Sequence, residues 1–488
     1  MPARIAAGRR AVYASAGPDP EETAVLVPSL RSRHARRLGA GLLALLLAGC
    51  GGPSAPLGAP AAATGPFQGA VVAPEPEAAL VGRQVLAAGG DAADAAVAMG
   101  FTLAVTLPSR VGLGGSGACL SFTPGGMPRA VLFPPQPAPL PPAAAADRPA
   151  ALPGFARGMY LLHATAGHLP FGPLLRPAAD AARRGVPVSR VLAADLRVVA
   201  TPLLADPAAR ALFAGPDGAP LRAGQVLRDP ALAATLQRLG RVGVGDLYQG
   251  LLSRLLVQDA AAAGGPMTAA GLRATRAWLA APIVLPAGRA RAAFLPPPAD
   301  GGLAAAAAFQ ALRAAPSGLA AAQARALAVA AAWRAGQGAP AALLADANLP
   351  AAGLGPLPAS TSFLAVDRKG GAVACATTMG NLFGTGRVLP QLGFLLGASP
   401  ARTPPPLLAA AMAWDPGRKR LLAAVAGSGQ DGAGMAVGAA LADALASGVP
   451  MPRPVPAPGR AQVILCPHGA ARCTAAHDPR GFGLALSR

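Results

Sequence analysis

The feature that most constrains this chain is a polar start to an apolar strand pattern in its last third. Ser360, Thr361 and Ser362 lead into the apolar run 363–366, and a turn-forming segment, 368–371, follows Asp367. An apolar run bounded by turn residues predicts a buried strand that ends in a tight turn. The hydroxyl at the head of such a strand is either an ordinary loop group or a nucleophile, and this segment alone leaves both open.

Composition sets the class of protein. The chain has 488 residues, of which 53% are hydrophobic and 13% charged, so it is long enough for a large core and too apolar for a disordered protein. The formal net charge is +20, but the basic residues are dispersed and almost all arginine, and aromatic residues make up 4%. Basic patches with interleaved aromatics are absent from the sequence, so nucleic acid is not an expected partner.

The N-terminal region, 1–49, resembles the export signal of a bacterial lipoprotein. An apolar run, 38–48, ends just before Cys50 and is preceded by four arginines, Arg31, Arg33, Arg36 and Arg37. The run is too short to span a bilayer as a permanent helix. We therefore expect a signal peptide over about 31–49, acylation of Cys50, and a flexible linker over 50–73. The alternatives are an ordinary signal peptide with a chance cysteine, or a buried helix.

These expectations place the protein in the periplasm, held to a membrane by a lipid anchor only. Residues 1–30 precede a complete signal, which suggests an over-extended start site. In an oxidising compartment Cys466 and Cys473, which flank a short loop, are close enough in sequence to form a disulfide, although spacing does not prove the pairing. Cys119 and Cys375 lie in apolar stretches and are expected to be small core residues.

No metal or cofactor is expected. His468, His477 and Asp478 do not complete a ligand spacing with Cys473. The glycine run 112–117 lacks the lysine of a phosphate-binding loop.

Two helices are predicted at the start of the mature chain. Residues 74–88 carry an apolar stripe and stop at a glycine pair, 89–90. The segment from Asp91 to Asp94 then caps a nearly all-apolar helix that reaches Leu107, and such a helix must be buried on most sides. A strand over 118–122 follows the glycine run.

Taken together, these segments resemble γ-glutamyltranspeptidases. The stretches 360–367 and 376–386 resemble the start of that family's small subunit, 89–96 resembles its first capped helix, and 112–117 its glycine-rich strand entry. Further matches follow in order at 152–154, 168–171, 227–250, 296–302 and 478–481. The resemblance therefore runs from about residue 74 to the end of the chain.

The resemblance implies an N-terminal-nucleophile hydrolase. The implied fold class is α/β (α+β), a four-layer αββα sandwich with two stacked, mainly antiparallel sheets. A large-subunit segment, 74–359, and a small-subunit segment, 360–488, would form one compact domain and remain associated as a heterodimer after self-cleavage between Ala359 and Ser360. Counting back from Asp367 places the nucleophile at Ser360, where the family has threonine.

The implied mechanism has two stages. The Ser360 hydroxyl first attacks the Ala359 carbonyl, and water resolves the resulting ester into two chains. The freed Ser360 then attacks a substrate amide and transfers the acyl group to water or an amine. Its own α-amine, whose pKa is about 7.7 to 8.0 when unperturbed, serves as the base. Thr378 would hydrogen-bond the nucleophile, and the turn of Gly427, Ser428 and Gly429 would hold the oxyanion.

The substrate side departs from the family. The arginine that binds the α-carboxylate of a glutamyl group aligns with Pro134, and the acidic pair that binds the α-amine aligns with Ala401 and Arg402. Losing these charges removes the charge-assisted bonds that recognise an α-amino acid. The candidate substrate contacts that remain are Thr361, Asn381 and Arg402, and candidates for a relocated carboxylate clamp are Arg110, Arg129 and Arg402, each also readable as a surface charge.

Three functions stay open. The first is a γ-glutamyltransferase or glutathione hydrolase that acts on small glutathione-like γ-glutamyl peptides or amides. The second is an N-terminal-nucleophile amidohydrolase with a different acyl specificity. The third is a catalytically degenerate periplasmic lipoprotein. Turnover of glutathione separates the first two, and chain cleavage separates both from most forms of the third.

Overall fold

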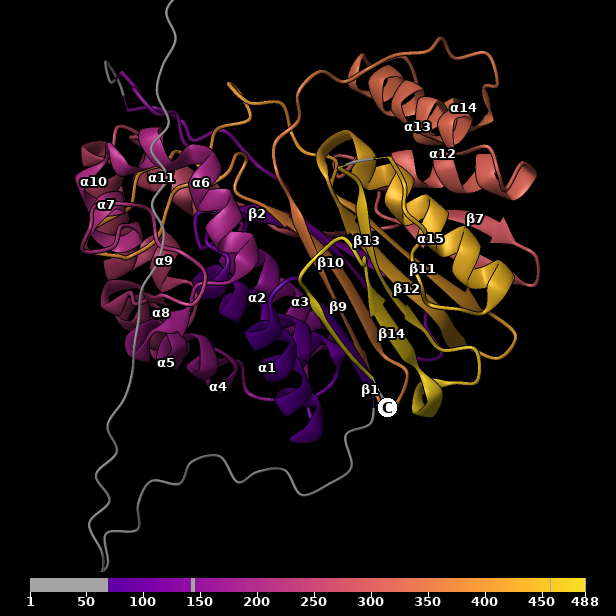
Figure 1. Ribbon diagram of the computed structural model, residues 1–488, viewed down its shortest axis with the longest axis horizontal. Coiled ribbons are helices and arrows are strands. Elements are labelled where there is room, and N and C mark those ends of the chain that lie inside the picture. The colour runs from indigo at the N-terminus through magenta and orange to yellow at the C-terminus, as the bar shows by residue number, and fades with distance from the viewer. Residues whose placement is uncertain (1–68, 142–144, 457, 488) are drawn as a thin grey trace, which may run out of the picture. The chain divides into compact units, whose positions relative to one another are not determined.

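The computed structural model describes residues 69–141, 145–456 and 458–487 (Figure 1). Its larger sheet has seven strands, and every neighbouring pair in it is antiparallel. In spatial order the strands are β15 (Leu484–Ser487), β1 (Gly69–Ala73), β9 (Thr361–Asp367), β10 (Ala372–Thr378), β2 (Ser116–Phe122), β3 (Arg129–Phe133) and β6 (Trp278–Ala280).

The second sheet has six strands, again all antiparallel to their neighbours. In spatial order they are β14 (Thr474–His477), β13 (Arg460–Leu465), β12 (Arg420–Ser428), β11 (Ala409–Asp415), β8 (Ala290–Phe294) and β7 (Ile283–Ala287). A separate two-residue pair joins β4 (Val186–Pro187) to β5 (Val226–Leu227).

Helices cover the outer face of each sheet (Figure 1). Those on the side of the larger sheet are α1 (Pro76–Ala87), α2 (Ala92–Thr106), α3 (Phe155–Ala166), α4 (Phe171–Leu174), α5 (Arg176–Arg184), α6 (Arg190–Leu204), α7 (Pro207–Phe213), α8 (Pro230–Val242), α9 (Asp246–Gln249), α10 (Leu251–Ala262) and α11 (Ala269–Ala274). Those on the side of the second sheet are α12 (Gly301–Ala314), α13 (Leu319–Arg334), α14 (Pro340–Ala345) and α15 (Ala433–Ser447). Two 3-10 turns, η1 (Gln430–Gly432) and η2 (Ala470–Arg472), complete the set.

Alternation along the strands divides the apolar residues into three layers. On β9, Phe363 faces the helices of the larger sheet and Leu364 faces the second sheet. On β12, Val425 faces α12 and α15, and Ala424 faces the larger sheet. Side chains that alternate across a strand in this way fill the space on both of its faces. The predicted four-layer αββα sandwich with two stacked antiparallel sheets is therefore confirmed.

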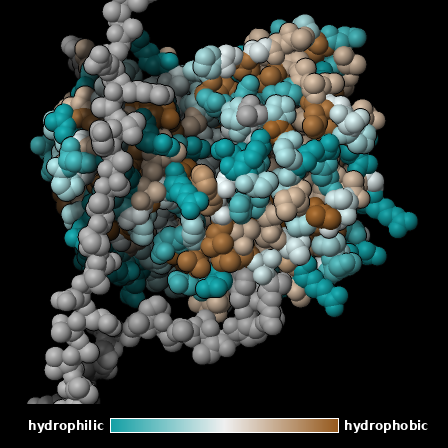
Figure 2. Space-filling view, viewed as in Figure 1, coloured by the Kyte–Doolittle hydropathy of each residue, from teal (hydrophilic) through white to brown (hydrophobic). Residues whose placement is uncertain are grey.

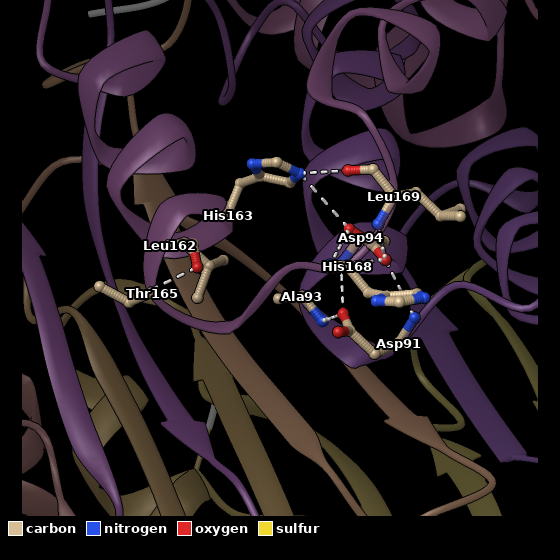
Figure 3. A network of polar contacts seen from close by, with 8 residues as sticks. All are labelled: Asp91, Ala93, Asp94, Leu162, His163, Thr165, His168 and Leu169. Carbon is tan, nitrogen blue, oxygen red and sulfur yellow. Dashed lines mark hydrogen bonds and ion pairs between the residues drawn. The ribbon is translucent and has the colours of Figure 1, made fainter.

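The two N-terminal helices form where the sequence predicts them. Asp91 is the N-cap of α2, and its side chain and that of Asp94 make a reciprocal capping box. Every residue of α2 is buried, as its apolar composition requires. The Asp94 carboxylate also accepts backbone hydrogen bonds from His168 at 3.1 Å and Leu169 at 3.0 Å, which ties α2 to the loop after α3 (Figure 3). His163 completes this network by bonding the Leu169 carbonyl at 2.7 Å.

One prediction about the start of the chain is corrected by the fold. Residues 69–73, expected to be the end of a flexible linker, form the buried strand β1 between β15 and β9. The rest of that linker, the signal region 1–49 and Cys50 lie outside the described residues. In the part of the chain that is described, no helix is long and apolar enough to cross a membrane. Figure 2 shows hydrophilic and hydrophobic residues interspersed over one face of the protein, in keeping with the dispersed charges of the sequence.

Both cysteine pairs are disulfides. Cys466 and Cys473 are bonded, as predicted, across the connection between β13 and β14. Cys119 and Cys375 are buried in the core, as predicted, and are also bonded to each other, which was not predicted from the sequence. The reason is the register of β2 and β10, which places these two residues directly opposite each other in the sheet.

Candidate active site

The strand register brings Ser360 and Thr378 together. Thr377 of β10 pairs with Thr361 of β9, so the next position along each strand places Thr378 beside Ser360. The Thr378 hydroxyl donates a hydrogen bond to the carbonyl oxygen of Ala359 at 2.8 Å and accepts one from the backbone N–H of Gly380 at 2.9 Å. The donor on one side and the acceptor on the other fix the orientation of this hydroxyl.

The Ser360 hydroxyl is buried and unpaired. Ser360 is 1% exposed, and its Oγ has no hydrogen-bond partner among the described residues. Leaving a buried hydroxyl unpaired costs about 1–3 kcal/mol, so a fold that keeps one here accepts a local loss of stability. A buried group without a partner calls for an explanation, and a catalytic role is one that fits the head of this strand.

Hydroxyl side chains gather at one end of the space between the sheets. Counting by two along β9 puts Ser360 and Ser362 on the face that also carries Leu364 and faces the second sheet. On β10 and β2 the same face carries Thr378 and Ser116, which are paired directly across the sheet. Ser116 is 2% exposed, and its hydroxyl too has no partner among the described residues. The apolar inter-sheet layer therefore ends in a polar rim.

The predicted oxyanion turn closes the other side of this rim. β12 ends at Ser428, and Gly429 has φ +107°, with the position of a Cβ only 2.2 Å from the Pro458 carbonyl, so no side chain fits there. The side-chain amide of Gln430 donates to the Leu357 carbonyl at 2.7 Å, which ties the turn to the segment just before Ala359. Gly427, the remaining residue of the turn, is also in β12.

A cavity of about 60 Å³ lies next to the site, and Ser360 and Thr378 are not among its lining residues. Thr361 and Ser362 line it from β9, and Ser428 lines it from β12. Its ionisable lining groups are Arg110, Arg460, His477 and Asp478. The Asp478 carboxylate is neutralised by Arg480, 2.8 Å away, which holds the pKa of Asp478 below its usual range against the opposing effect of burial.

Arg110 is not the solvated surface charge that one interpretation of the sequence allowed. Its Nε and Nη2 each donate to the Asp195 carboxylate at 2.7 Å, and its Nη1 lies 3.5 Å from the Ser360 carbonyl oxygen. Ser109 also donates to Asp195, at 2.7 Å. Nearby, burial raises the pKa of Glu75 to about 8, against a hydrogen bond from Ser189 that lowers it; the Asp195 charge raises it further and the Arg110 charge lowers it.

Comparison with known proteins places this chain in a family. A family model described as Gamma-glutamyltranspeptidase matches residues 78–349, which is more than half of the chain. The chain belongs to the γ-glutamyltranspeptidase family. This confirms the resemblance that the sequence motifs predicted.

Named relatives and a solved structure agree with this assignment. A glutathione hydrolase proenzyme of Escherichia coli (strain K12) is 30% identical over 255 residues, 48% of this chain and 43% of the relative. An acylase ACY 1 proenzyme of Pseudomonas sp. (strain V22) is 33% identical over 241 residues, 44% of this chain and 42% of the relative. The chain thus matches less than half the length of each. The crystal structure of a cephalosporin acylase from Bacillus halodurans superimposes with a TM-score of 0.72 at 19% identity, covering 89% of this chain and 99% of that one, and so shows a shared fold.

The substrate-side residues that the γ-glutamyltranspeptidase pattern suggested do not converge on Ser360. Asn381 and Arg402 are exposed, and within the described ranges neither side chain hydrogen-bonds to Ser360 or Thr378. The Asn381 side chain instead accepts from the N–H of Leu382 at 3.0 Å. Pro134, which replaces the family arginine, is buried just after β3. Arg129, also considered as a clamp, is exposed at the start of β3.

Three contributors to the site were missed from the sequence. Ser116 was missed because it lies opposite Thr378 of β10, a strand that was not predicted from the sequence. The other two contributors are long-range contacts. Arg110 and Asp195 are 85 positions apart, and Gln430 and Leu357 are 73 positions apart, so no local sequence pattern predicts either contact. Substrate contacts of Thr361, Asn381 and Arg402 and the catalytic roles of the other site residues stay predictions.

Proposed function

We propose that this chain is the precursor of a γ-glutamyl hydrolase or transferase of the N-terminal-nucleophile type, which cuts itself between Ala359 and Ser360. One observation carries the proposal. The carbonyl to be attacked, that of Ala359, already accepts a hydrogen bond from Thr378, and the hydroxyl that would attack it, that of Ser360, is buried and free of any partner among the described residues.

The first stage is an N-to-O acyl shift. Ser360 Oγ bonds to the Ala359 carbonyl carbon, the Ala359–Ser360 C–N bond breaks, and the hydroxyl proton ends on the released amine. Negative charge develops on the Ala359 carbonyl oxygen during the attack, and the Thr378 hydroxyl stabilises that charge from its observed position. Water then hydrolyses the ester, which leaves a carboxylate on Ala359 and restores the Ser360 hydroxyl.

The second stage uses the new N-terminus. The Ser360 hydroxyl, with the adjacent α-amine as the base, attacks a substrate amide and forms an acyl-enzyme. The turn of Gly427, Ser428 and Gly429 would supply backbone donors to the oxyanion, since Ser428 lines the same cavity as Thr361 and Ser362. Water or an amine then accepts the acyl group. A serine hydroxyl follows the same logic here as the threonine hydroxyl of the family.

Intact mass and N-terminal sequencing test the first stage. Wild type should give two fragments, one of which begins at Ser360, and Ser360→Ala should stay uncut. Two matched controls, Thr361→Val and Ser362→Ala, remove the next hydroxyls of the same strand and should still cleave. A new N-terminus at Thr361 would show that Ser360 is not the nucleophile. So would loss of cleavage in Thr361→Val while Ser360→Ala is still cut. A folded, uncut wild-type chain would overturn the proposal in favour of a catalytically degenerate protein.

The substrate-side residues favour a second candidate function, an amidohydrolase whose acyl specificity is not γ-glutamyl. Pro134 and Arg402 replace groups that recognise the α-carboxylate and α-amine in the family, and Arg402 reverses the charge. Relatives include both a glutathione hydrolase and an acylase. Turnover of γ-glutamyl-p-nitroanilide and of glutathione supports the γ-glutamyl assignment. If the protein turns over butyryl-p-nitroanilide but neither γ-glutamyl-p-nitroanilide nor glutathione, the result supports an amidohydrolase of different acyl specificity.

We also propose that the protein is exported to the periplasm and held to a membrane by a lipid on Cys50. The support is the run of four arginines, apolar core and Cys50 in the sequence, together with two disulfides in the fold, which persist in oxidising compartments. Labelling of producing cells with radioactive palmitate should mark wild type and not Cys50→Ser. An unlabelled wild-type protein in the soluble fraction would contradict the anchor.

A further inference from the structure

The first inference concerns the only side chain shown within hydrogen-bond range of the Ser360 carbonyl in the described residues, that of Arg110. The guanidinium cannot turn freely, because two of its nitrogens are held by Asp195 at 2.7 Å each. Asp195 belongs to α6 and is 5% exposed, and it is itself fixed by a third hydrogen bond, from Ser109. The third nitrogen of Arg110 therefore points at Ser360 as a fixed donor.

Cleavage would remove one of the two covalent restraints on Ser360. In the precursor a peptide bond on each side holds this residue, whereas afterwards its N-terminal side is free. Only one neighbouring strand supports the start of β9, since β1 pairs with β9 only as far as Val72 opposite Leu364, whereas β10 pairs with it as far as Thr361. A fixed donor on the Ser360 carbonyl replaces part of the lost restraint.

Charge around the cavity favours an unprotonated amine. The cations are Arg110, Arg460 and Arg480, and the anions are Asp195 and Asp478. Within the described residues Arg460 has no carboxylate within 4.0 Å. Glu75 keeps its proton up to about pH 8 because it is buried. His477 also lines the cavity, from β14. The excess is therefore positive, and a nearby positive charge disfavours an ammonium group.

We propose that Arg110, fixed by Asp195, is a positioning residue that holds the new N-terminal residue Ser360 and keeps its α-amine unprotonated. This rests on the proposed cleavage before Ser360. Arg110 does not take part in bond making. It would act through the carbonyl and the amine of the nucleophile, so its loss should change the titration of the amine as well as the rate.

The test measures the amine itself. Cleaved protein is acetylated with limiting acetic anhydride over a range of pH, and mass spectrometry follows the N-terminal peptide of the small segment. In Arg110→Met the apparent pKa of the Ser360 amine should rise by on the order of one unit relative to wild type. The matched control is Arg238→Met. Arg238 also makes two hydrogen bonds to one carboxylate, that of Asp246, but neither residue lines the cavity, so this variant should leave the pKa of the Ser360 amine unchanged.

Two further variants keep the test decisive. Arg110→Lys retains the charge without the two-pronged geometry, so the amine should titrate nearly as in wild type. If Arg110→Met does not fold because Asp195 is left unpaired, Arg110→Met/Asp195→Asn removes both charges. The pKa should still rise, by less, since the cation lies nearer to Ser360 than the anion. A cleaved chain with an unchanged amine pKa overturns this proposal alone, whereas an uncut wild-type chain overturns the proposed function and this proposal together.

An independent observation carries a second inference. The disulfide between Cys119 and Cys375 joins β2 of the large segment to β10 of the small segment, and the proposed cut at 359–360 falls between them. The other disulfide, Cys466–Cys473, lies entirely within the small segment. We infer that cleavage leaves the two segments covalently joined through Cys119 and Cys375. Formation of the bond removes two protons and two electrons from the thiols, which a disulfide oxidant such as oxidised glutathione accepts.

Electrophoresis under denaturing conditions tests this link, with iodoacetamide added first to block free thiols. Cleaved wild type should run as one species without reductant and as two with reductant. Cys466→Ala/Cys473→Ala should behave in the same way, whereas Cys119→Ala/Cys375→Ala should separate without reductant. Two fragments from non-reduced wild type would overturn the link. An uncut chain whose non-reduced peptide map joins the two cysteine peptides would overturn the cleavage and retain the link.

Discussion

The hydroxyl oxygen of Thr378 lies 2.8 Å from the carbonyl oxygen of Ala359 and donates a hydrogen bond to it. Because Ser360 is the next residue after this carbonyl, the same contact polarises the bond that self-cleavage would break. The N–H of Gly380 occupies the lone pair of the hydroxyl on the other side. Thr378 is thus oriented before any substrate arrives.

Thr378→Val should slow the conversion of precursor to two fragments by about 100-fold or more, because removing one oxyanion donor typically costs about 3–4 kcal/mol. Thr378→Ser keeps the donor and should cleave at a rate within about ten-fold of wild type. Intact-mass measurement of purified precursor over time gives both rates. Thr377→Val is the matched control. Its hydroxyl is buried on the opposite face of β10 and has no partner among the described residues, so this variant should cleave normally.

Asp94→Ala should destabilise the fold by about 2–5 kcal/mol, because it removes the buried carboxylate that accepts hydrogen bonds from the N–H groups of Asp91, His168 and Leu169. Urea unfolding of the cleavage-deficient Ser360→Ala background measures the loss on a single chain. The comparison is Asp180→Ala, which removes a partly exposed pair with Arg183 and should cost less than about 1 kcal/mol. Equal losses in the two variants would contradict the role given to the Asp94 network.

Stability should fall as pH rises from about 5 to 8, in part because of Glu75. Burial raises its pKa from 4.5 to about 8, so in this window the folded chain holds a proton that the unfolded chain has released. Stability that depends on that proton is complete below the unfolded pKa and is lost as pH rises through the folded one. Glu75→Gln keeps an acceptor for Ser189 and should be more stable than its parent by about 2–4 kcal/mol at pH 8 and by little at pH 4.5.

Urea unfolding at pH 4.5, 6 and 8 measures this difference, again in the Ser360→Ala background. Glu77→Gln, an exposed position on the same helix, is the control and should follow its parent at each pH. A Glu75→Gln curve parallel to that of its parent would show that Glu75 is ionised in the folded protein.

What could be predicted from the sequence follows the range of each interaction. Asp91 and Asp94 cap α2 through contacts within one helical turn, and Ser360 was located by counting along one strand, so both were within reach of local patterns. β1 was missed because Gly69–Ala73 is short and continues an alanine-rich, glycine-rich stretch that reads as linker. The Cys119–Cys375 bond depends on pairing across 256 positions, which spacing cannot reveal.

The substrate side shows the same limit in another form. The motif resemblance placed Pro134 and Arg402 at the positions of the family's carboxylate-binding and amine-binding residues. It could not show that Arg402 is exposed. Nor could it show that Arg110, from a turn after α2, contacts Ser360. Motifs fix which residues replace which, whereas the charges that face a cavity depend on loops that have no periodic pattern.

The charge at Arg402 gives the last prediction. If the site accepts a γ-glutamyl group, Arg402 stands where the family has a partner for its α-ammonium, and like charges repel. Arg402→Asp should therefore raise kcat/KM for γ-glutamyl-p-nitroanilide about ten-fold relative to that for butyryl-p-nitroanilide, since a charge-assisted bond contributes about 1.5 kcal/mol or more. Because Arg402 is exposed, the substitution should not change stability appreciably. Arg418→Asp, at an exposed hairpin position, controls for net charge. An unchanged ratio in Arg402→Asp would show that this residue does not face the acyl group, and would strengthen the assignment of a different acyl specificity.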